Sequence, residues 1–236
     1  MKDIKANEQA ELLSILSETD ISVPDRTEGR ETEHCERWSI CRLLATLATH
    51  NRLAFPVELA KRERPDFLLK TGGRHVGVEV TEVINPDYAK ATTLPEANVD
   101  ATIIDPSLFK WGTPKRPLGD LRSIVSKRKL TGPGWEGSSV EIEYANAILD
   151  VMSSKTEKVR SQTFDKFPEN WLIIYCNLTL PFLDLEEANQ FFQEKAKNYW
   201  KKDAFSMVFV EKGEKIICYS QDVSEPMDLA NLWSSG

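Results

Sequence analysis

Two acidic residues, Asp66 and Glu79, are the side chains of this sequence whose type and spacing best suit chemistry. Between them stand Gly72 and Gly73, flanked by alternating, β-branched segments, which predicts a β-hairpin over 66–83. If the hairpin turns symmetrically about the glycines, Asp66 lies opposite Glu79, with Cβ atoms roughly 4.5–5.5 Å apart. Two such carboxylates repel unless one stays protonated or a cation lies between them. Mg²⁺ prefers oxygen ligands of this kind, so the pair predicts a divalent-metal site.

The opposite face of the predicted hairpin is apolar and can be buried against a core. It carries Phe67, Leu69, Val76, Val78 and Val80. Each acid by itself has a simpler interpretation, because Asp66 could be a turn residue after Pro65 and Glu79 an exposed strand residue. The two acids in register favour a site over this simpler interpretation.

The hairpin resembles the core of the PD-(D/E)xK nuclease superfamily, which has the restriction-endonuclease-like fold. The resemblance lies in Arg64-Pro65-Asp66-Phe67-Leu68-Leu69, the glycine turn, and Gly77-Val78-Glu79-Val80-Thr81-Glu82. This motif covers about 20 residues, and the order of the elements that follow extends the likeness to roughly residues 31–220.

The resemblance implies an α/β protein with a mixed central β-sheet flanked by helices, of the αβββαβ type. It also implies that Asp66 and Glu79 bind Mg²⁺, for which Mn²⁺ can substitute, and that an upstream helix adds a glutamate. The implied activity is that of a metal-dependent endonuclease that hydrolyses phosphodiester bonds, with DNA preferred over RNA as the substrate.

Glu36 is the preferred candidate for the helix acid. The segment 31–52 predicts an amphipathic helix, on which Glu36 lies nearer than Glu33 to the apolar stripe. Glu58 and Glu63 rank lower, because the charged segment around them is more simply a solvated surface. On a regular strand Glu82 points away from Glu79, so we do not expect it to bind metal.

A lysine is missing from the position where the family usually has one, two residues after the second acid, because Thr81 stands there. Some members supply the lysine from a later helix. The segment 139–160 predicts a helix, with Lys155 on the apolar stripe expected to face the sheet. Lys155 is therefore the candidate catalytic lysine, with Lys158 as its substitute. The alternative is that Lys155 extends to solvent at a frayed helix end.

The remaining segments predict a mixed sheet with helices packed on it. Residues 1–30 are expected to form a helix (4–18) and a polar arm that could mediate dimerisation or bind a protein partner, and 31–236 the nuclease-like domain. Within it we expect a loop-rich excursion over 84–138 with a helix near 118–129, a buried strand over 171–180, a helix starting at Asp184, and two strands around Gly213.

The excursion is rich in cations and contains Trp111 and Trp135, a combination that suits phosphates and bases. A solvated charged surface is the alternative interpretation. The candidate nucleic-acid-binding residues are Lys110, Lys115, Arg116, Lys127, Arg128 and Lys129.

The composition bounds the remaining possibilities. The 236 residues carry a net charge of −7, which argues against a positively charged protein that binds nucleic acid without selectivity. No apolar run is long enough for a membrane span or a signal peptide, so we expect a cytoplasmic protein. No two of the four cysteines have the CxxC spacing that is typical of zinc sites. Two alternatives stay open: an inactive nuclease-fold module that binds nucleic acid or protein, and a metal-free hydrolase that uses the two acids as glycosidases do.

Overall fold

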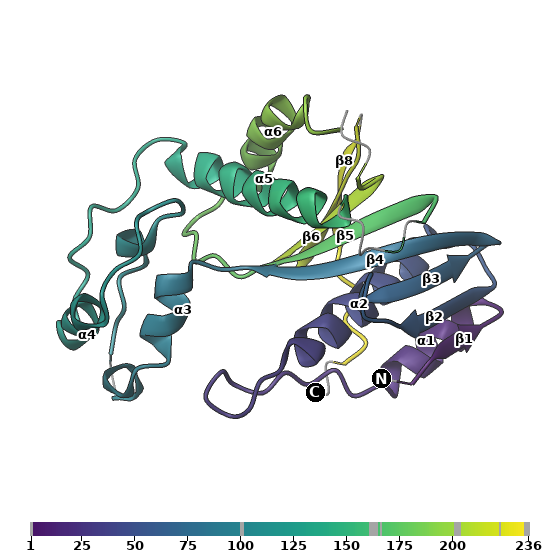
Figure 1. Ribbon diagram of the computed structural model, residues 1–236, viewed down its shortest axis with the longest axis horizontal. Helices are drawn as coiled ribbons and strands as arrows, with labels where there is room; N and C mark the ends of the chain where they lie inside the picture. Colours follow the sequence, from purple (N-terminus) through teal and green to yellow (C-terminus); the bar gives the residue numbers. More distant parts are fainter. Residues whose placement is uncertain are drawn as a thin grey trace. The chain divides into compact units, whose positions relative to one another are not determined.

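The chain is an α/β protein built on a mixed eight-stranded β-sheet flanked by helices (Figure 1). The computed structural model describes residues 2–99, 102–160, 165, 167–200, 204–221 and 223–233. The strands lie in the sheet in the order in which they occur along the chain, and of the pairings that are defined only β5 with β6 is parallel. Their bounds are β1 Ile4–Ala6, β2 Val57–Lys61, β3 Phe67–Thr71, β4 Arg74–Val83, β5 Glu169–Cys176, β6 Met207–Lys212, β7 Lys215–Tyr219 and β8 Ser224–Asp228.

The helices divide between two compact units. Unit 1 comprises residues 1–82, 152–176 and 197–236, and unit 2 comprises 83–151 and 177–196. The α-helices are α1 Gln9–Ser17, α2 Thr32–Thr49, α3 Pro86–Thr92, α4 Leu118–Ser126, α5 Ser139–Val159 and α6 Leu185–Ala196. Among these helices as the structure describes them, none is long and apolar enough to cross a membrane.

The core of unit 1 lies between the sheet and the helices α1 and α2. Leu12 and Leu16 of α1 and Ile40 and Leu44 of α2 are fully buried in one cluster with side chains of the strands. Figure 1 shows α1 and α2 beside β1–β3. Because one face of α2 is held by this packing, the orientation of its other side chains is fixed.

The β3–β4 hairpin has the predicted register. Phe67 pairs with Val78 and Leu69 with Val76, and all four side chains are buried. Gly72 and Gly73 form the turn, each with a positive φ (54° and 81°), which is the backbone of the two-residue turns that match the twist of a hairpin. The glycines therefore set the register of every residue in the hairpin.

Three strands and one α-helix of the described residues differ from the elements expected from the sequence. In β2 the side chains of Val57 and Leu59 are buried, so the segment expected as solvated surface is an inner strand of the sheet. Its charges are compensated across the ladders, where Glu58 lies opposite Lys70 and accepts a hydrogen bond from its Nζ at 2.8 Å. The other missed elements are β1, β8 and α3.

The N-terminal segment contributes to the sheet and the core. The helix expected over 4–18 begins only at Gln9, because Ile4–Ala6 pairs with β2 as β1. A three-residue strand is too short for its alternation to be recognised in a sequence.

Unit 2 has a small core of its own. The buried residues Ala91, Leu94, Phe109, Leu121 and Val125 form one cluster. The predicted helix near 118–129 is present as α4, and the predicted helix after Asp184 is present as α6. Asp184 caps α6, since its side chain accepts hydrogen bonds from the backbone N–H groups of Glu186 and Glu187.

The hairpin turn gives a stability prediction with a built-in control. A Cβ at Gly72 would lie 2.6 Å from the Cβ of Ala54, whereas a Cβ at Gly73 would meet nothing within 4 Å, although both positions have positive φ. We expect Gly72→Ala to lower the free energy of unfolding by about 2–4 kcal/mol and Gly73→Ala by only about 1 kcal/mol. Urea unfolding of both variants measures the difference. Equal losses would show that the contact with Ala54 does not constrain the turn.

Candidate active site

The two acids of the hairpin come together as the register requires. Asp66 directly precedes β3, and because Phe67 pairs with Val78 the next position along the ladder places Asp66 opposite Glu79. The backbone N–H of Val80 donates a 2.7 Å hydrogen bond to Oδ2 of Asp66. This bond holds the Asp66 carboxylate against β4, beside Glu79.

Lys155 reaches the acids from α5. Its Nζ lies 3.0 Å from Oε2 of Glu79 and 3.3 Å from the carbonyl oxygen of Val80, to both of which it donates hydrogen bonds. The side chains of Lys155 and Glu79 are only 17% and 9% exposed, so this ion pair is largely removed from water. The neighbouring Met152 and Thr156 are fully or almost fully buried, which fixes this face of α5.

Of the two lysines considered, Lys155 is the one placed at the acids. Lys158 is exposed. Lys155 therefore does not extend to solvent, and its position suits the role predicted for the helix lysine, although that role itself stays a prediction.

Glu36 is buried on α2, whereas Glu33 is exposed in the first turn of the same helix. The burial follows from the helix period, because Ile40, one turn after Glu36, is in the core. The carboxylate of Glu36 accepts a hydrogen bond from Nζ of Lys61 in β2. Glu36 thus lies near Asp66, but a cation of the chain already compensates its charge.

The environment of Asp66 opposes its ionisation. Burial raises the pKa of Asp66 to about 6, with a further contribution from the negative charge of Glu79 and a smaller one from that of Glu36. The hydrogen bond from Val80 and the charge of Lys155 act in the opposite direction and do not cancel the shift. The ionised form of Asp66 is therefore disfavoured, mainly because the carboxyl group is buried and in part because Glu79 lies beside it.

A hollow of ≈ 450 Å³ lies over these residues, entirely within unit 1. Its lining includes Asp66, Glu36 and Lys155. It also includes residues that the sequence analysis did not single out as site residues, among them Arg26 and Arg30 from the segment expected to be a polar arm. Two arginines four residues apart in a loop give no periodic signal, so only the fold shows that they face the acids.

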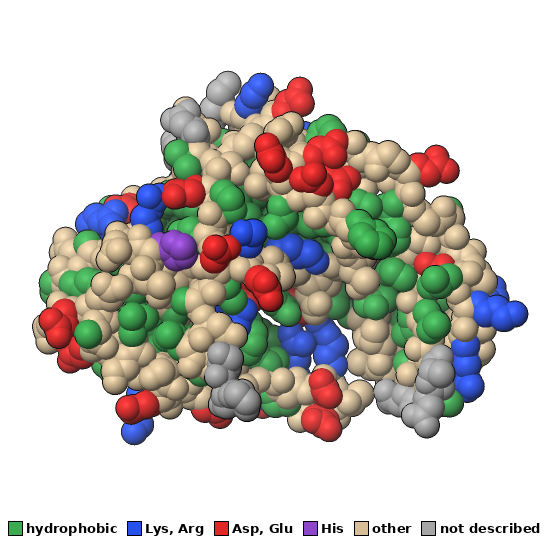
Figure 2. Space-filling model, turned by 180° about the vertical axis from the view of Figure 1, so that it is seen from behind, with side chains coloured by type: hydrophobic (Ala, Val, Ile, Leu, Met, Phe, Trp, Pro, Cys, Tyr) green, Lys and Arg blue, Asp and Glu red, His purple; other side chains and the backbone are tan. Residues whose placement is uncertain are grey.

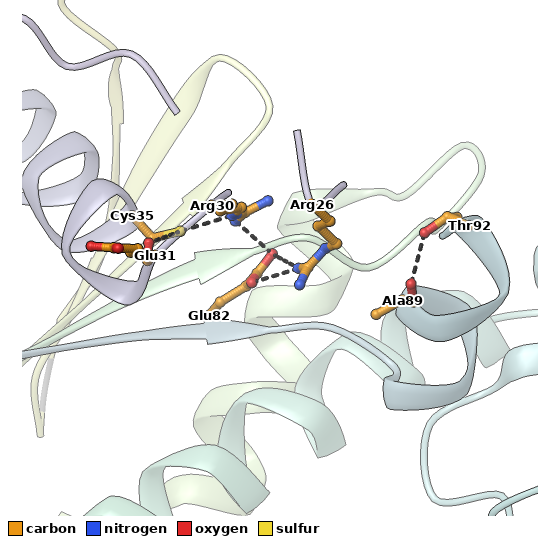
Figure 3. Close-up of polar contacts among 7 residues, drawn as sticks. All are labelled: Arg26, Arg30, Glu31, Cys35, Glu82, Ala89 and Thr92. Carbon is orange, nitrogen blue, oxygen red and sulfur yellow. Dashed lines mark hydrogen bonds and ion pairs between the residues drawn. The ribbon is translucent and has the colours of Figure 1, made fainter. Parts of the chain in front are cut away.

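Glu82 lines the same hollow but is paired with the two arginines. Arg26 donates to both carboxylate oxygens of Glu82 at 2.7 Å, and Arg30 donates to one of them at 3.3 Å (Figure 3). Arg30 also donates to Sγ of Cys35 at 3.0 Å. Glu82 is thus bound by cations of the chain, and we do not expect it to bind a metal.

The six basic residues proposed for nucleic-acid binding all belong to unit 2. Lys115, Lys127, Arg128 and Lys129 are exposed. Lys110 and Arg116 contact unit 2 itself: Nζ of Lys110 lies over the ring of Trp135, and Arg116 is 3.9 Å from Asp87. Figure 2 shows acidic and basic side chains intermixed over the face that it presents. Nucleic-acid binding by these residues stays a prediction.

The donor set of the hollow suits a hard divalent cation held by two protein ligands. Mg²⁺ is usually bound by one or two carboxylates and keeps several waters, and Asp66 and Glu79 supply such a pair. In the described part of the chain no three His, Cys, Asp or Glu side chains form a ready metal-binding group. Glu36 as a third ligand therefore stays a prediction.

Comparisons with known proteins give no match. A scan against protein-family models, a search of curated proteins and a search of solved structures each find nothing that matches this chain.

The raised pKa of Asp66 predicts how the free energy of unfolding changes with pH. Because the folded pKa is about 6 against 3.8 for the ordinary group, the folded chain binds more protons than the unfolded chain between these values, and its stability falls as pH rises through this window. Asp66→Asn removes the titration while keeping an oxygen for the Val80 N–H. In EDTA at pH 7.5 we expect the variant to be more stable than the parent by on the order of 1–3 kcal/mol, and the difference to vanish below about pH 4.

Urea unfolding at pH 4, 5.5 and 7.5 measures this difference. Asp228→Asn is the matched control, since a hydrogen bond from Lys215 lowers the pKa of Asp228 and the substitution should not stabilise the chain at any pH. The interpretation of Asp66 is wrong if Asp66→Asn is no more stable than the parent at pH 7.5.

Proposed function

We propose that this chain is a divalent-metal-dependent nuclease with a restriction-endonuclease-like core, and that it hydrolyses phosphodiester bonds, most readily those of DNA. The observation that carries the proposal is the juxtaposition of Asp66, Glu79 and Lys155, of which Asp66 and Lys155 line one hollow and Glu79 is bound to Lys155. Paired acids can hold the cation of a metal-assisted phosphoryl hydrolysis, and a nearby lysine can stabilise the charge that develops on the phosphate.

Asp66 and Glu79 would hold the cation, Mg²⁺ or Mn²⁺, with Glu36 assisting. The bound cation would lower the pKa of a water and offset the charge of the scissile phosphate. Lys155 would position the attacking water and stabilise the negative charge that develops on the phosphate, because its ammonium group is held 3.0 Å from Glu79 and largely out of water.

Thr81 occupies the strand position of the usual lysine, and Lys155 supplies an ammonium group to the same acids from α5. Val80 provides the link: its N–H binds Asp66 and its carbonyl oxygen binds Lys155, so one peptide segment of β4 positions both groups. This supports a helix lysine in place of the strand lysine.

The second candidate is a module that binds nucleic acid or protein without cleaving it. It is favoured by the ion pairs that already engage Lys155 with Glu79 and Lys61 with Glu36, because a site compensated by its own cations has less need of a metal. This candidate requires binding that is independent of divalent ions.

Metal binding can be tested without activity. Because a ligand that binds only the folded state raises its stability, we expect millimolar Mg²⁺ or Mn²⁺ to raise the Tm of the parent by several degrees relative to EDTA. Asp66→Asn should show less than about a third of this shift, whereas Asp228→Asn should respond as the parent does. Equal shifts in all three proteins would place the bound ion elsewhere.

Cleavage tests the chemistry. Plasmid, linear and single-stranded DNA, with an RNA control, are incubated with the parent, Asp66→Asn, Lys155→Met and the control Lys158→Met, in Mg²⁺, Mn²⁺ and EDTA. We expect cleavage only with a divalent ion, a loss of at least about 100-fold in rate for the first two variants, and a rate near that of the parent for Lys158→Met.

Three outcomes would contradict the proposal. Cleavage at the parent rate by Asp66→Asn would remove the proposed site, and full activity in excess EDTA would favour the metal-free hydrolase. An absence of cleavage together with nucleic-acid binding in EDTA would favour the non-catalytic module.

A further inference from the structure

A second recess, of ≈ 230 Å³, shares part of its lining with the hollow over Asp66. Arg30, Cys35 and Tyr175 line both spaces. The second recess is further lined by Trp38, so two aromatic side chains border it. The part of the hollow that Arg26 and Arg30 line, here called the entrance, therefore lies next to an aromatic recess, and the residues that line both spaces belong to unit 1.

The entrance carries two arginines that share one acidic partner. Arg26 and Arg30 both bind the carboxylate of Glu82 (Figure 3), and both line the hollow that Asp66 also lines. Guanidinium groups bind phosphate through paired hydrogen bonds, and a phosphate can replace a carboxylate as their partner. The two arginines therefore suit a phosphate group adjacent to the one at Asp66.

The base of the entrance holds a polar group without a partner. Oγ of Ser39 has no hydrogen-bond partner among the residues that the structure describes, although Ser39 is 1% exposed and lines the hollow. A buried hydroxyl left unpaired is unfavourable, and most such groups in proteins bind water or a ligand. The unpaired hydroxyl of Ser39 therefore points to a polar ligand in the hollow, independently of the arginines.

The recess itself suits a planar, partly polar group. The indole of Trp38 is held by Arg42, whose guanidinium carbon lies 4.4 Å from the ring centroid, and by a hydrogen bond from Nε1 to Glu211. Tyr175 projects from β5 into the same space. Aromatic rings held in this way are the usual platforms on which single-stranded nucleic acids stack their bases.

We infer that this recess is a subsite for one unpaired nucleotide next to the scissile phosphodiester, with its phosphate on Arg26 and Arg30 and its base between Trp38 and Tyr175. The inference rests on the proposed function and names its substrate class. A base inside a duplex must unpair and unstack before it can enter such a recess. The favoured substrate is therefore single-stranded or frayed nucleic acid.

The test compares steady-state cleavage of a single-stranded oligonucleotide with that of a duplex closed by hairpins at both ends. We expect the parent to have a kcat/KM at least about tenfold higher for the single strand. Arg30→Gln and Tyr175→Leu should each raise KM for the single strand by roughly tenfold while kcat changes less than about threefold, because they remove a phosphate contact and a stacking surface for the neighbouring nucleotide and do not touch the reacting bond.

Two control variants and one further test variant separate this role from a structural one. Tyr175→Phe keeps the ring and should retain the parent KM. Arg74→Gln removes an exposed arginine paired with Glu169 and controls for the loss of one charge and one ion pair. Ser39→Ala should raise KM for the single strand without lowering Tm, since its hydroxyl has no partner within the described chain.

The outcomes distinguish failure of the subsite from failure of the proposed function. One result is cleavage by the parent that depends on Asp66 and Lys155, with the same KM for Arg30→Gln and Tyr175→Leu as for Arg74→Gln. That result contradicts the subsite and leaves the proposed nuclease activity intact. If the parent cleaves none of the substrates, the proposed nuclease activity is contradicted. Binding of a fluorescent oligothymidylate in Mg²⁺ then decides the subsite, which is overturned if Tyr175→Leu binds as tightly as the parent.

Discussion

The candidate site of unit 1 depends on the β3–β4 register, which holds two acidic side chains opposite one another. Burial of the hairpin face that carries Phe67 and Val78 fixes this register, because a slip by one residue would turn those side chains out of the core. The apolar face thus forces Asp66 and Glu79 together on the other side. The repulsion is a consequence of packing, and the rest of the site compensates for it.

That compensation comes from three different elements. Lys155 on α5 pairs with Glu79, Lys61 on β2 pairs with Glu36, and the Val80 N–H binds Asp66. The pKa of Asp66 nevertheless stays near 6, mainly because its carboxyl group is buried, so these contacts do not offset the cost of its ionisation. Residues that stabilise a fold alone are rarely kept in such an unfavourable state, whereas sites that bind cations often are. This imbalance is the physical basis of the proposed metal site.

The sequence predicted the parts of this arrangement that depend on local patterns. The glycine turn, the alternation of the hairpin and the helical period of α5 were enough to place Asp66 opposite Glu79 and to direct Lys155 toward the sheet. It could not predict that Glu36 is paired with Lys61, because β2 was mistaken for solvated surface. Nor could it place Arg26 and Arg30 at the hollow, since a loop without periodicity is positioned only by tertiary contacts such as those with Glu82.

A lysine on a helix differs physically from one on the strand beside the acids. A strand lysine two residues after Glu79 would extend from the same strand as that acid and move with it. Lys155 instead approaches from α5 and donates two hydrogen bonds to β4, one to the Glu79 carboxylate and one to the Val80 carbonyl oxygen. Its ammonium group is therefore positioned by the packing of α5, which the buried Met152 and Thr156 enforce. Position 81 is thereby freed from charge, and in this chain the uncharged Thr81 lines the hollow together with the arginines.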